Sequence, residues 1–338
     1  MVAARPNSLN VRSGNSFALF RGILGGLIAG FGLNHAGLFP ISIALALLWS
    51  SSRFPLAGFF WGSLAVLASH RWLLALHPLN WIGIPSFLSL PIALTIWLFC
   101  GFLAGALVGS WTLIANWIAL RTFKGRDLGI KALHAVVMAC LWGLAEVLLA
   151  RLPLFWIGLG GNLLPGDLAL AGLARWFGAG GLAAVQVLIG WWLWQVVLFW
   201  RNGKSVVKLI SIGLIVLVIS HALGWSLLLN PSNSESIPVA VWQPAIPTRT
   251  KFSKEQQRRL PLAFQNALEK AERLNAAWLI TPEGTLSAGQ ELLKPSPLPL
   301  LSGGFRWSRG EQRSSLLVFR PGEQKPSSSI DKHRLVPL

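Results

Sequence analysis

The chain has 338 residues, of which 53% are hydrophobic and only 12% are charged. This number of charged groups is too small to cover the surface of a water-soluble protein of this size. Part of the surface is therefore expected to face lipid. The net charge of +17 alone would suit a nucleic-acid partner. However, residues 1–229 carry 14 Lys or Arg and 3 acidic residues, a net of +11, and most of these basic residues lie in short loops between apolar runs. This distribution is typical of the topology signal of a membrane protein and excludes a groove-binding patch.

Apolar runs dominate residues 1–229, for which we predict a transmembrane domain of seven helices. A span needs about 20 mostly apolar residues. The second predicted span is short, and Pro91 predicts a tilt or kink in the long fourth. The predicted spans are 18–34, 37–52, 55–76, 87–117, 132–150, 177–200 and 207–229.

The basic residues of the loops predict an orientation. With the N-terminus in the cytoplasm, the inside segments hold ten Lys or Arg, whereas the outside loops before the last span hold only Arg151 and Arg175. The positive-inside rule therefore favours an inside N-terminus. Seven spans then place everything after residue 230 on the outer face of the membrane.

The loop between the fifth and sixth spans is the exception to this pattern. Residues 151–176 are rich in Pro, Gly, Trp and Leu, which indicates either a segment lying at the membrane interface or an ordinary ordered loop. Glu146 precedes it inside a span, where an ionisable group is costly and a candidate for function. Glu146 is expected either to hold the 151–176 segment or, as the preferred interpretation, to pair with Arg151 or His134. Cys100 and Cys140 are expected to be small buried residues of the spans.

The pattern changes after a polar linker at 230–236. Residues 237–243 and 276–283 are typical of buried strands, and 314–323 of a third strand. Between the first two, Ser253 and Gln256 have capping-box spacing, and apolar residues follow at helical spacing, although Pro261 predicts a later start or a kink. Strand, helix and strand predict a parallel unit and an α/β domain over 237–338.

Two charged residues of this domain are candidates for chemistry. Glu283 follows the apolar strand residues WLIT (278–281) and Pro282, and functional groups gather beyond the carboxyl ends of strands in open α/β sheets. A carboxylate there can act as a general base, or it can be a solvated glutamate in a turn. Lys332 lies between Asp331 and His333, a pattern also typical of a solvated charge cluster.

Ordered motifs connect these residues to a known family. The domain resembles the nitrilase, or carbon–nitrogen hydrolase, superfamily, and the whole chain is similar to its membrane member, the apolipoprotein N-acyltransferase family. Two membrane stretches add to the similarity, WGLAE (142–146) and LFW (154–156) with Gly158. The motifs of the domain are VAVWQ (239–243), LITPE (279–283), LSGG (301–304) and DKHRLVP (331–337).

The resemblance implies an extracytoplasmic α-β-β-α sandwich in a bacterial inner membrane protein, with a Glu-Lys-Cys catalytic set. Glu283 would be the general base and Lys332 the cation that stabilises the oxyanion. Phe252, Trp156 and Glu146 would be contacts for lipid or substrate. The family takes an acyl chain from a phospholipid and passes it, through a Cys thioester, to the N-terminal amine of a diacylglyceryl-Cys lipoprotein. It needs no metal or other cofactor.

The resemblance also predicts a missing part. Members of the family continue beyond VP (336–337). Their nucleophilic Cys lies several dozen residues beyond the end of this chain, and they also have an eighth span. This chain is therefore expected to be truncated and inactive as given. A thiolate is needed for an acyl-enzyme, and both Cys of this chain fall in spans. The alternatives are a membrane-tethered amidase or nitrilase that uses water, a lipid-binding protein without activity, and a transporter.

Overall fold

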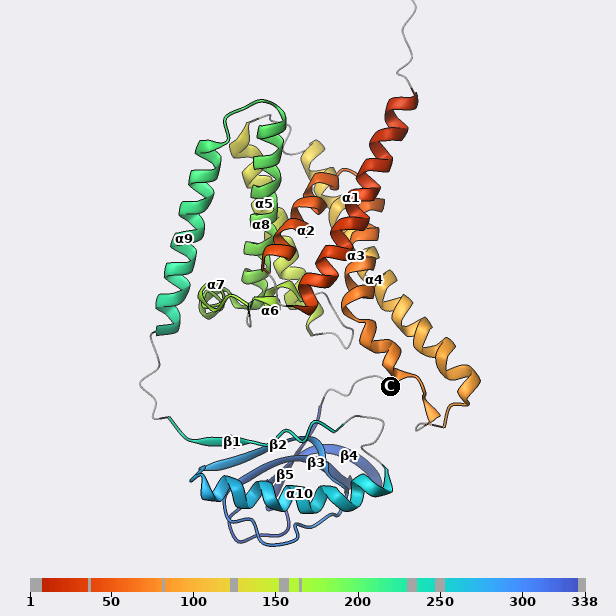
Figure 1. Ribbon diagram of the computed structural model, residues 1–338, viewed down its shortest axis with the longest axis vertical. Coiled ribbons are helices and arrows are strands. Elements are labelled where there is room, and N and C mark those ends of the chain that lie inside the picture. The colour runs from red at the N-terminus through yellow and green to blue at the C-terminus, as the bar shows by residue number, and fades with distance from the viewer. Residues whose placement is uncertain are drawn as a thin grey trace, which may run out of the picture. The chain divides into compact units, whose positions relative to one another are not determined.

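The computed structural model describes residues 8–35, 38–80, 83–121, 127–151, 158–163, 166–229, 236–246 and 253–333. The chain divides into two compact units, Met1–Pro231 and Ser232–Leu338. The first is a bundle of helices and the second contains the β-sheet (Figure 1).

The helical unit follows the predicted apolar runs. Within the described residues, five helices have segments that are long and apolar enough to cross a membrane, so this is a multi-pass membrane protein. Two more apolar helices have only 14 and 15 residues, α2 and α3. The helices are α1 (Ser8–Asn34), α2 (Leu38–Ser51), α3 (Pro55–Ser69), α4 (Ser86–Arg121), α5 (Leu128–Leu149), α8 (Ala174–Arg201) and α9 (Val207–Leu229).

One boundary of the predicted spans differs from the structure. The third span was predicted to reach residue 76, but α3 ends at Ser69 and a separate 3-10 helix, η1 (Arg71–Leu76), follows. The fourth runs as one helix of 36 residues with Pro91 inside it. Pro91 lies in the second turn of α4, so it removes hydrogen bonding only near the start of the helix.

Four tryptophans form the centre of the helical unit. Trp49, Trp61, Trp111 and Trp142 are at most 6% exposed and meet edge to face, with ring centroids 5.0–6.2 Å apart. Each indole N–H has an acceptor, which is a backbone carbonyl for the first three and Glu146 for Trp142. A tryptophan can be buried in this way only when its N–H is bonded. These tryptophans therefore build the core of the helical unit.

The segment between α5 and α8 contains two short helices, α6 (Leu159–Asn162) and α7 (Leu168–Ala171). At the crossing of α7 and α9, a Cβ added to Gly172 would meet the Gly224 carbonyl, and one added to Gly224 would meet the Ala169 carbonyl. Asp167 also accepts a 2.9 Å hydrogen bond from His221 of α9. Figure 1 shows α7 at one end of α9. The absence of side chains on both glycines is what allows this close approach.

The second unit is a five-stranded mixed sheet with strand order β1-β2-β3-β4-β5. The first three strands are parallel, and the β3–β4 and β4–β5 pairs are antiparallel. The predicted strand-helix-strand unit is confirmed, since α10 connects the parallel strands β1 and β2. The elements are β1 (Val239–Val241), α10 (Lys254–Arg273), β2 (Trp278–Leu286), β3 (Leu300–Ser308), β4 (Glu311–Phe319) and β5 (Ser328–Asp331).

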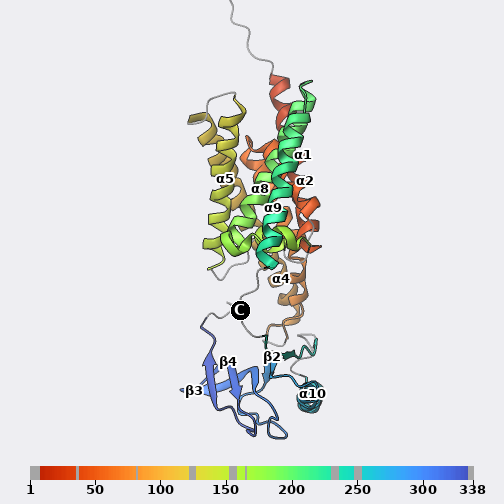
Figure 2. The same ribbon diagram turned by 90° about the vertical axis from the view of Figure 1, so that its left-hand side faces the viewer.

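Helix α10 covers one face of this sheet (Figure 2). It begins at Lys254, where Ser253 accepts the N–H of Gln256 at 3.2 Å, and it contains Pro261, so the predicted later start is wrong. Phe264 and Leu268 of α10 are buried against Leu279 of β2 and Phe319 of β4. This apolar contact holds the helix to the sheet.

Residues on the other face of the sheet are also apolar. Val241, Ile280, Leu301 and Val318 are paired in register across β1 to β4, so their side chains share one face. Val241 is 73% exposed and Ile280 is 37% exposed. Within the residues that the structure describes, this second face is left partly open to solvent.

Candidate active site

Glu283 lies in an irregular part of β2. The pairing of β2 with β3 shifts register between Thr281 and Leu286. Pro282 has no N–H for the ladder, and Gly284 has a φ of +66°, which favours glycine. The Thr285 hydroxyl donates to the Pro282 carbonyl at 2.7 Å and closes the turn. The sequence Thr-Pro-Glu-Gly-Thr therefore makes a bulge that carries the Glu283 side chain.

Gly303 of β3 allows this bulge to lie close to its neighbour. A Cβ at Gly303 would be 2.5 Å from the Glu283 Cα and 2.5 Å from the Pro282 carbonyl oxygen. Such distances are not tolerated by real side chains, so glycine is required for the observed backbone approach. One residue earlier, the Thr281 hydroxyl donates to the Ser302 hydroxyl at 2.8 Å, and both residues are buried.

The two charged residues singled out by the sequence lie side by side. The Lys332 Nζ donates to both carboxylate oxygens of Glu283 at 3.0 Å. The Ser314 hydroxyl of β4 donates to Glu283 Oε1 at 2.9 Å, and the Lys332 N–H donates to the Ser314 carbonyl at 2.9 Å. The Glu283 and Lys332 side chains are 59% and 35% exposed, so a substrate can reach them. Three strands, β2, β4 and β5, therefore hold a carboxylate, a hydroxyl and an ammonium together.

Arg306 and Asp331 fix the end of β5, from which Lys332 emerges. The Arg306 guanidinium donates to the two carboxylate oxygens of Asp331 at 2.6 and 2.7 Å, and the Ser315 hydroxyl donates to Asp331 at 2.8 Å. The Arg306 and Ser315 hydrogen bonds lower the pKa of Asp331 to about 2. Arg306 and Ser314 could not be predicted from the sequence, because they come from strands whose pairing is not visible in residue spacing.

The Arg306–Asp331 pair predicts a pH dependence. The folded-state pKa of Asp331 lies below its ordinary value of 3.8, so its stabilising effect is present above about pH 4 and is lost as the pH falls toward 2. Hydrogen–deuterium exchange of the β4 and β5 amides, corrected for intrinsic rates, should therefore rise between pH 4 and 2. Asp331→Asn should show the faster exchange already at pH 7. Glu311→Gln, at the exposed start of β4, is the control, and equal exchange in both variants would contradict the prediction.

A small cleft lies beside the bulge. Its volume is about 120 Å³, and it is lined by Gln243, Pro244 and Leu260 together with residues 282–285. Glu283 is thus at the edge of a space large enough for a few atoms of a substrate. Phe252 and Trp156, the predicted lipid contacts, and the VP motif at 336–337 lie outside the described residues.

Glu146 occupies a second polar site, inside the helical unit. It is 6% exposed and accepts hydrogen bonds from the Trp142 indole at 3.1 Å, from the Leu159 N–H at 2.8 Å and from the Gly160 N–H at 3.2 Å. These contacts agree with the expectation that Glu146 holds the 151–176 segment. His134, one of the expected partners, is hydrogen-bonded to the Ala115 carbonyl at 3.0 Å.

Neither cysteine of the chain is in the sheet unit. Cys100 lies in α4 and is partly exposed, and Cys140 lies in α5 and is exposed, so the expectation that both are buried is wrong. A thiol behaves as a small apolar group, so it is accommodated on a lipid-facing helix surface as well as in a protein core. Within the described part of the chain, no group of three or more His, Cys, Asp or Glu side chains could hold a metal ion.

Comparison with known proteins supports the resemblance that the motifs indicated. No known family profile matches the chain. It is 60% identical over 325 residues to an apolipoprotein N-acyltransferase of Prochlorococcus marinus strain MIT 9313, covering 96% of this chain and 65% of that protein. It is 51% identical to the protein of that name from strain SARG, covering 95% of this chain and 65% of that protein.

A third relative, from Parasynechococcus marenigrum strain WH8102, is 48% identical over 321 residues, covering 95% of this chain and 67% of the relative. This chain thus spans about two thirds of the length of the curated relatives that it matches. Identity at this level over nearly the whole chain confirms the predicted resemblance. The chain belongs to the apolipoprotein N-acyltransferase family.

Proposed function

We propose that this chain supplies the membrane domain and the first part of the catalytic domain of an enzyme that acylates lipoproteins. The acyl donor is a phospholipid, and the acceptor is the N-terminal amine of a diacylglyceryl-Cys lipoprotein. The observation that carries this proposal is the pairing of Glu283 with Lys332 at 3.0 Å, because two residues 49 positions apart meet in the arrangement that the family resemblance implies.

The proposed roles follow from the chemistry of these groups. In the first half-reaction, the Glu283 carboxylate accepts the proton of a cysteine thiol, and the thiolate attacks the ester carbonyl of the phospholipid. The ammonium of Lys332 stabilises the oxyanion that forms. The C–O bond then breaks, the lysophospholipid oxygen takes the proton from Glu283, and a thioester remains.

In the second half-reaction, the amine of the lipoprotein attacks the thioester carbonyl. Glu283 accepts a proton from the attacking nitrogen and returns it to the departing thiolate as the amide forms. The nucleophilic cysteine is assigned to the third of the relatives' length that this chain does not span, because Cys100 and Cys140 belong to membrane helices.

We further infer that the C-terminal unit is one half of a nitrilase-like α-β-β-α sandwich. Helix α10 covers one face of the sheet, and the apolar row from Val241 to Val318 crosses the other. An apolar face on a sheet is normally buried against a second layer. A second sheet packed on this row would complete the sandwich, with 237–338 as its N-terminal part.

We also propose seven spans with an inside N-terminus, so that residues 237–338 are extracytoplasmic. Helices α2 and α3 are only about 21 and 22 Å long at 1.5 Å per residue, shorter than the hydrocarbon core. They lie in the centre of the helical unit, with Leu45 and Trp61 fully buried, so neighbouring helices shield their ends. The excess of basic residues in the inside loops supports the orientation.

The decisive experiment uses this chain extended with the C-terminal third of the Prochlorococcus marinus MIT 9313 relative. The extended protein, in vesicles of a labelled phospholipid, is mixed with a synthetic diacylated lipopeptide. We expect mass spectrometry to find one additional acyl group on the peptide amine and an equal amount of lysophospholipid.

The matched control carries serine at the cysteines of the extension, and it should produce neither product. Release of free fatty acid with an unchanged lipopeptide would identify a hydrolase instead and would overturn the proposal. A fully active serine control would overturn the assignment of the nucleophile.

A further inference from the structure

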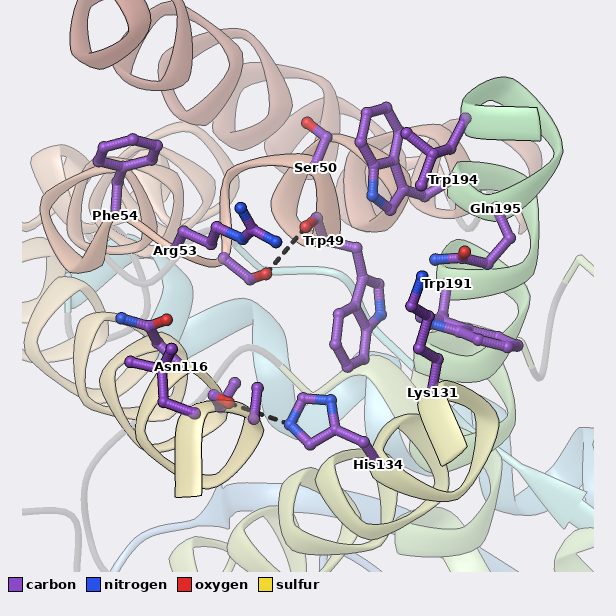
Figure 3. Close-up of a pocket in the computed structure, with 15 residues that line it drawn as sticks. Trp49, Ser50, Arg53, Phe54, Asn116, Lys131, His134, Trp191, Trp194 and Gln195 are labelled. Atoms are coloured by element: carbon purple, nitrogen blue, oxygen red, sulfur yellow. Dashed lines mark hydrogen bonds between the residues drawn. The ribbon is translucent and has the colours of Figure 1, made fainter. Parts of the chain in front are cut away.

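A cavity of about 820 Å³ lies within the helical unit, and none of its described lining residues has a role in the proposed reaction. It lies between the C-terminal ends of α2, α4 and α8 and the N-terminal ends of α3 and α5 (Figure 3). Its size is within the range of roughly 300–1,000 Å³ that is usual for ligand sites. The chain order places it at the end of the bundle where α9 begins, opposite to the end that carries α6 and α7.

The charged side chains of this cavity are all basic. Arg53 and Lys131 line it, and none of its described lining residues is acidic. Figure 3 shows Arg53 approaching from one wall and Lys131 from the other. Both side chains are exposed, and within the described part of the chain neither has an ion-pair partner. Two cations that converge on one space attract an anion more strongly than either does alone.

Gln195 adds a buried polar group. It is 5% exposed, lines the cavity, and its Oε1 has no hydrogen-bond partner within the described residues. A buried polar atom without a partner costs free energy, so a ligand that bonds to it after a rotation of the carboxamide is favoured. The carboxamide has both donors and an acceptor, which suits an ester or a hydroxyl beside a charged group.

Three tryptophans form the apolar walls. The Trp49 indole donates its N–H to the Val187 carbonyl at 3.0 Å, which fixes the ring at the cavity. Trp191 and Trp194 are half-buried on α8, four residues and one residue before Gln195. Indole rings are favourable next to the glycerol region of a lipid, where apolar and polar groups meet.

We propose that this cavity binds the glycerophosphate headgroup of an anionic phospholipid, at a site distinct from that of the acyl donor. Arg53 and Lys131 contact the phosphate, Gln195 bonds to the glycerol or ester oxygens, and the tryptophans pack against the glycerol and the first methylenes. Basic pockets between membrane helices are known to hold phosphorylated lipid headgroups. In the proposed orientation, this lipid belongs to the inner leaflet.

The positive-inside rule explains why basic residues lie at this end of the bundle, but it does not explain the cavity. Arg121 and Lys208 lie at the same end, and neither is among the lining residues. Arg121 instead lies 4.8 Å from the centre of the Trp117 ring. These two residues therefore provide a control in which the same number of charges is removed from the same end.

The test is the thermal unfolding of the purified chain in an uncharged detergent. Phosphatidylglycerol should raise Tm by about 5 °C at roughly a hundredfold excess over Kd, and phosphatidylcholine should not. The double variant Arg53→Gln/Lys131→Gln should bind phosphatidylglycerol at least about tenfold more weakly, whereas Arg121→Gln/Lys208→Gln should keep the full shift. Soluble glycerol 3-phosphate distinguishes a lipid headgroup from a free phosphate ester as the ligand. A rise in Tm with glycerol 3-phosphate alone would assign the site to a free phosphate ester of the same chemistry.

Gln195→Leu gives a second, independent readout. Because it removes an unpartnered polar atom, the variant should be at least as stable as the parent without lipid, and it should lose most of the lipid-dependent rise in Tm. An equal loss of the lipid response in both double variants, an equal response to phosphatidylcholine, or no response in the parent protein would overturn the proposal.

Discussion

Replacing Glu283 with glutamine should lower the rate of acyl transfer at least about a hundredfold in the extended protein, because a general base contributes 10²–10⁴ to such reactions. Glutamine has nearly the volume of glutamate and can still accept the hydrogen bond of Ser314, which is 2.9 Å long in the parent. It cannot accept a proton from a thiol or an amine. Initial rates with the diacylated lipopeptide, together with circular dichroism to check folding, measure the effect.

Lys332→Gln should reduce the same rate by a comparable factor, because the cation stabilises the developing oxyanion. Glu311→Gln is the matched control, since Glu311 is an exposed carboxylate at the start of β4 that pairs with Arg313. It should keep the parental rate. Full activity in both Glu283→Gln and Lys332→Gln would refute the assignment of the site.

The largest loss of stability in the helical unit is expected for Glu146→Ala. This change leaves the indole N–H of Trp142 and the backbone N–H groups of Leu159 and Gly160 without their acceptor in a buried site. Each unsatisfied buried donor costs about 1–3 kcal/mol, and partial relaxation gives an expected total of about 3–5 kcal/mol. Equilibrium unfolding in detergent and SDS mixtures measures this difference.

Glu146→Gln separates the hydrogen bonds from the charge. Oε1 accepts two of the three bonds and Oε2 accepts the third, so glutamine can keep two and should lose about half as much stability as alanine. Glu255→Ala is the control, because Glu255 is an exposed residue in the first turn of α10. A Glu146→Ala variant as stable as this control would show that the three bonds contribute little.

The membrane helices could be predicted because a bilayer leaves few alternatives for long apolar runs. The β1-α10-β2 unit could be predicted because its apolar residues have the patterns typical of buried strands and of a helix. Strand β3 was missed because Gly303 and Gly304 interrupt it, and glycine in a sequence indicates a turn more often than a strand. Strand β5 was missed because its two serines give no apolar alternation.

Some features of the candidate sites could likewise be predicted from the sequence, and others could not. Glu283 could be singled out because it comes directly after a run of apolar strand residues, although it lies in a bulge within β2, and Lys332 because of its motif. Their pairing depends on the order of β2, β4 and β5, which no local pattern contains. Gln195 gave no signal at all, because a glutamine in an apolar run shows its importance only when its missing partner is seen.

The close crossing of α7 and α9 has a consequence for the tolerance of α9 to mutation. Between Ile212 and Ile219 most side chains of α9 are exposed in the bundle and face lipid, and lipid tails solvate leucine, isoleucine, valine or phenylalanine about equally well. These positions can therefore exchange freely among apolar residues. At Gly224 a single added methyl group would collide with the Ala169 carbonyl, and at Gly213 with the Trp192 ring. The position of this helix is thus specified by its two glycines, by the hydrogen bond of His221 to Asp167 and by Leu223 and Leu227, which pack against the core. Its large lipid-facing residues specify only that it lies in a membrane.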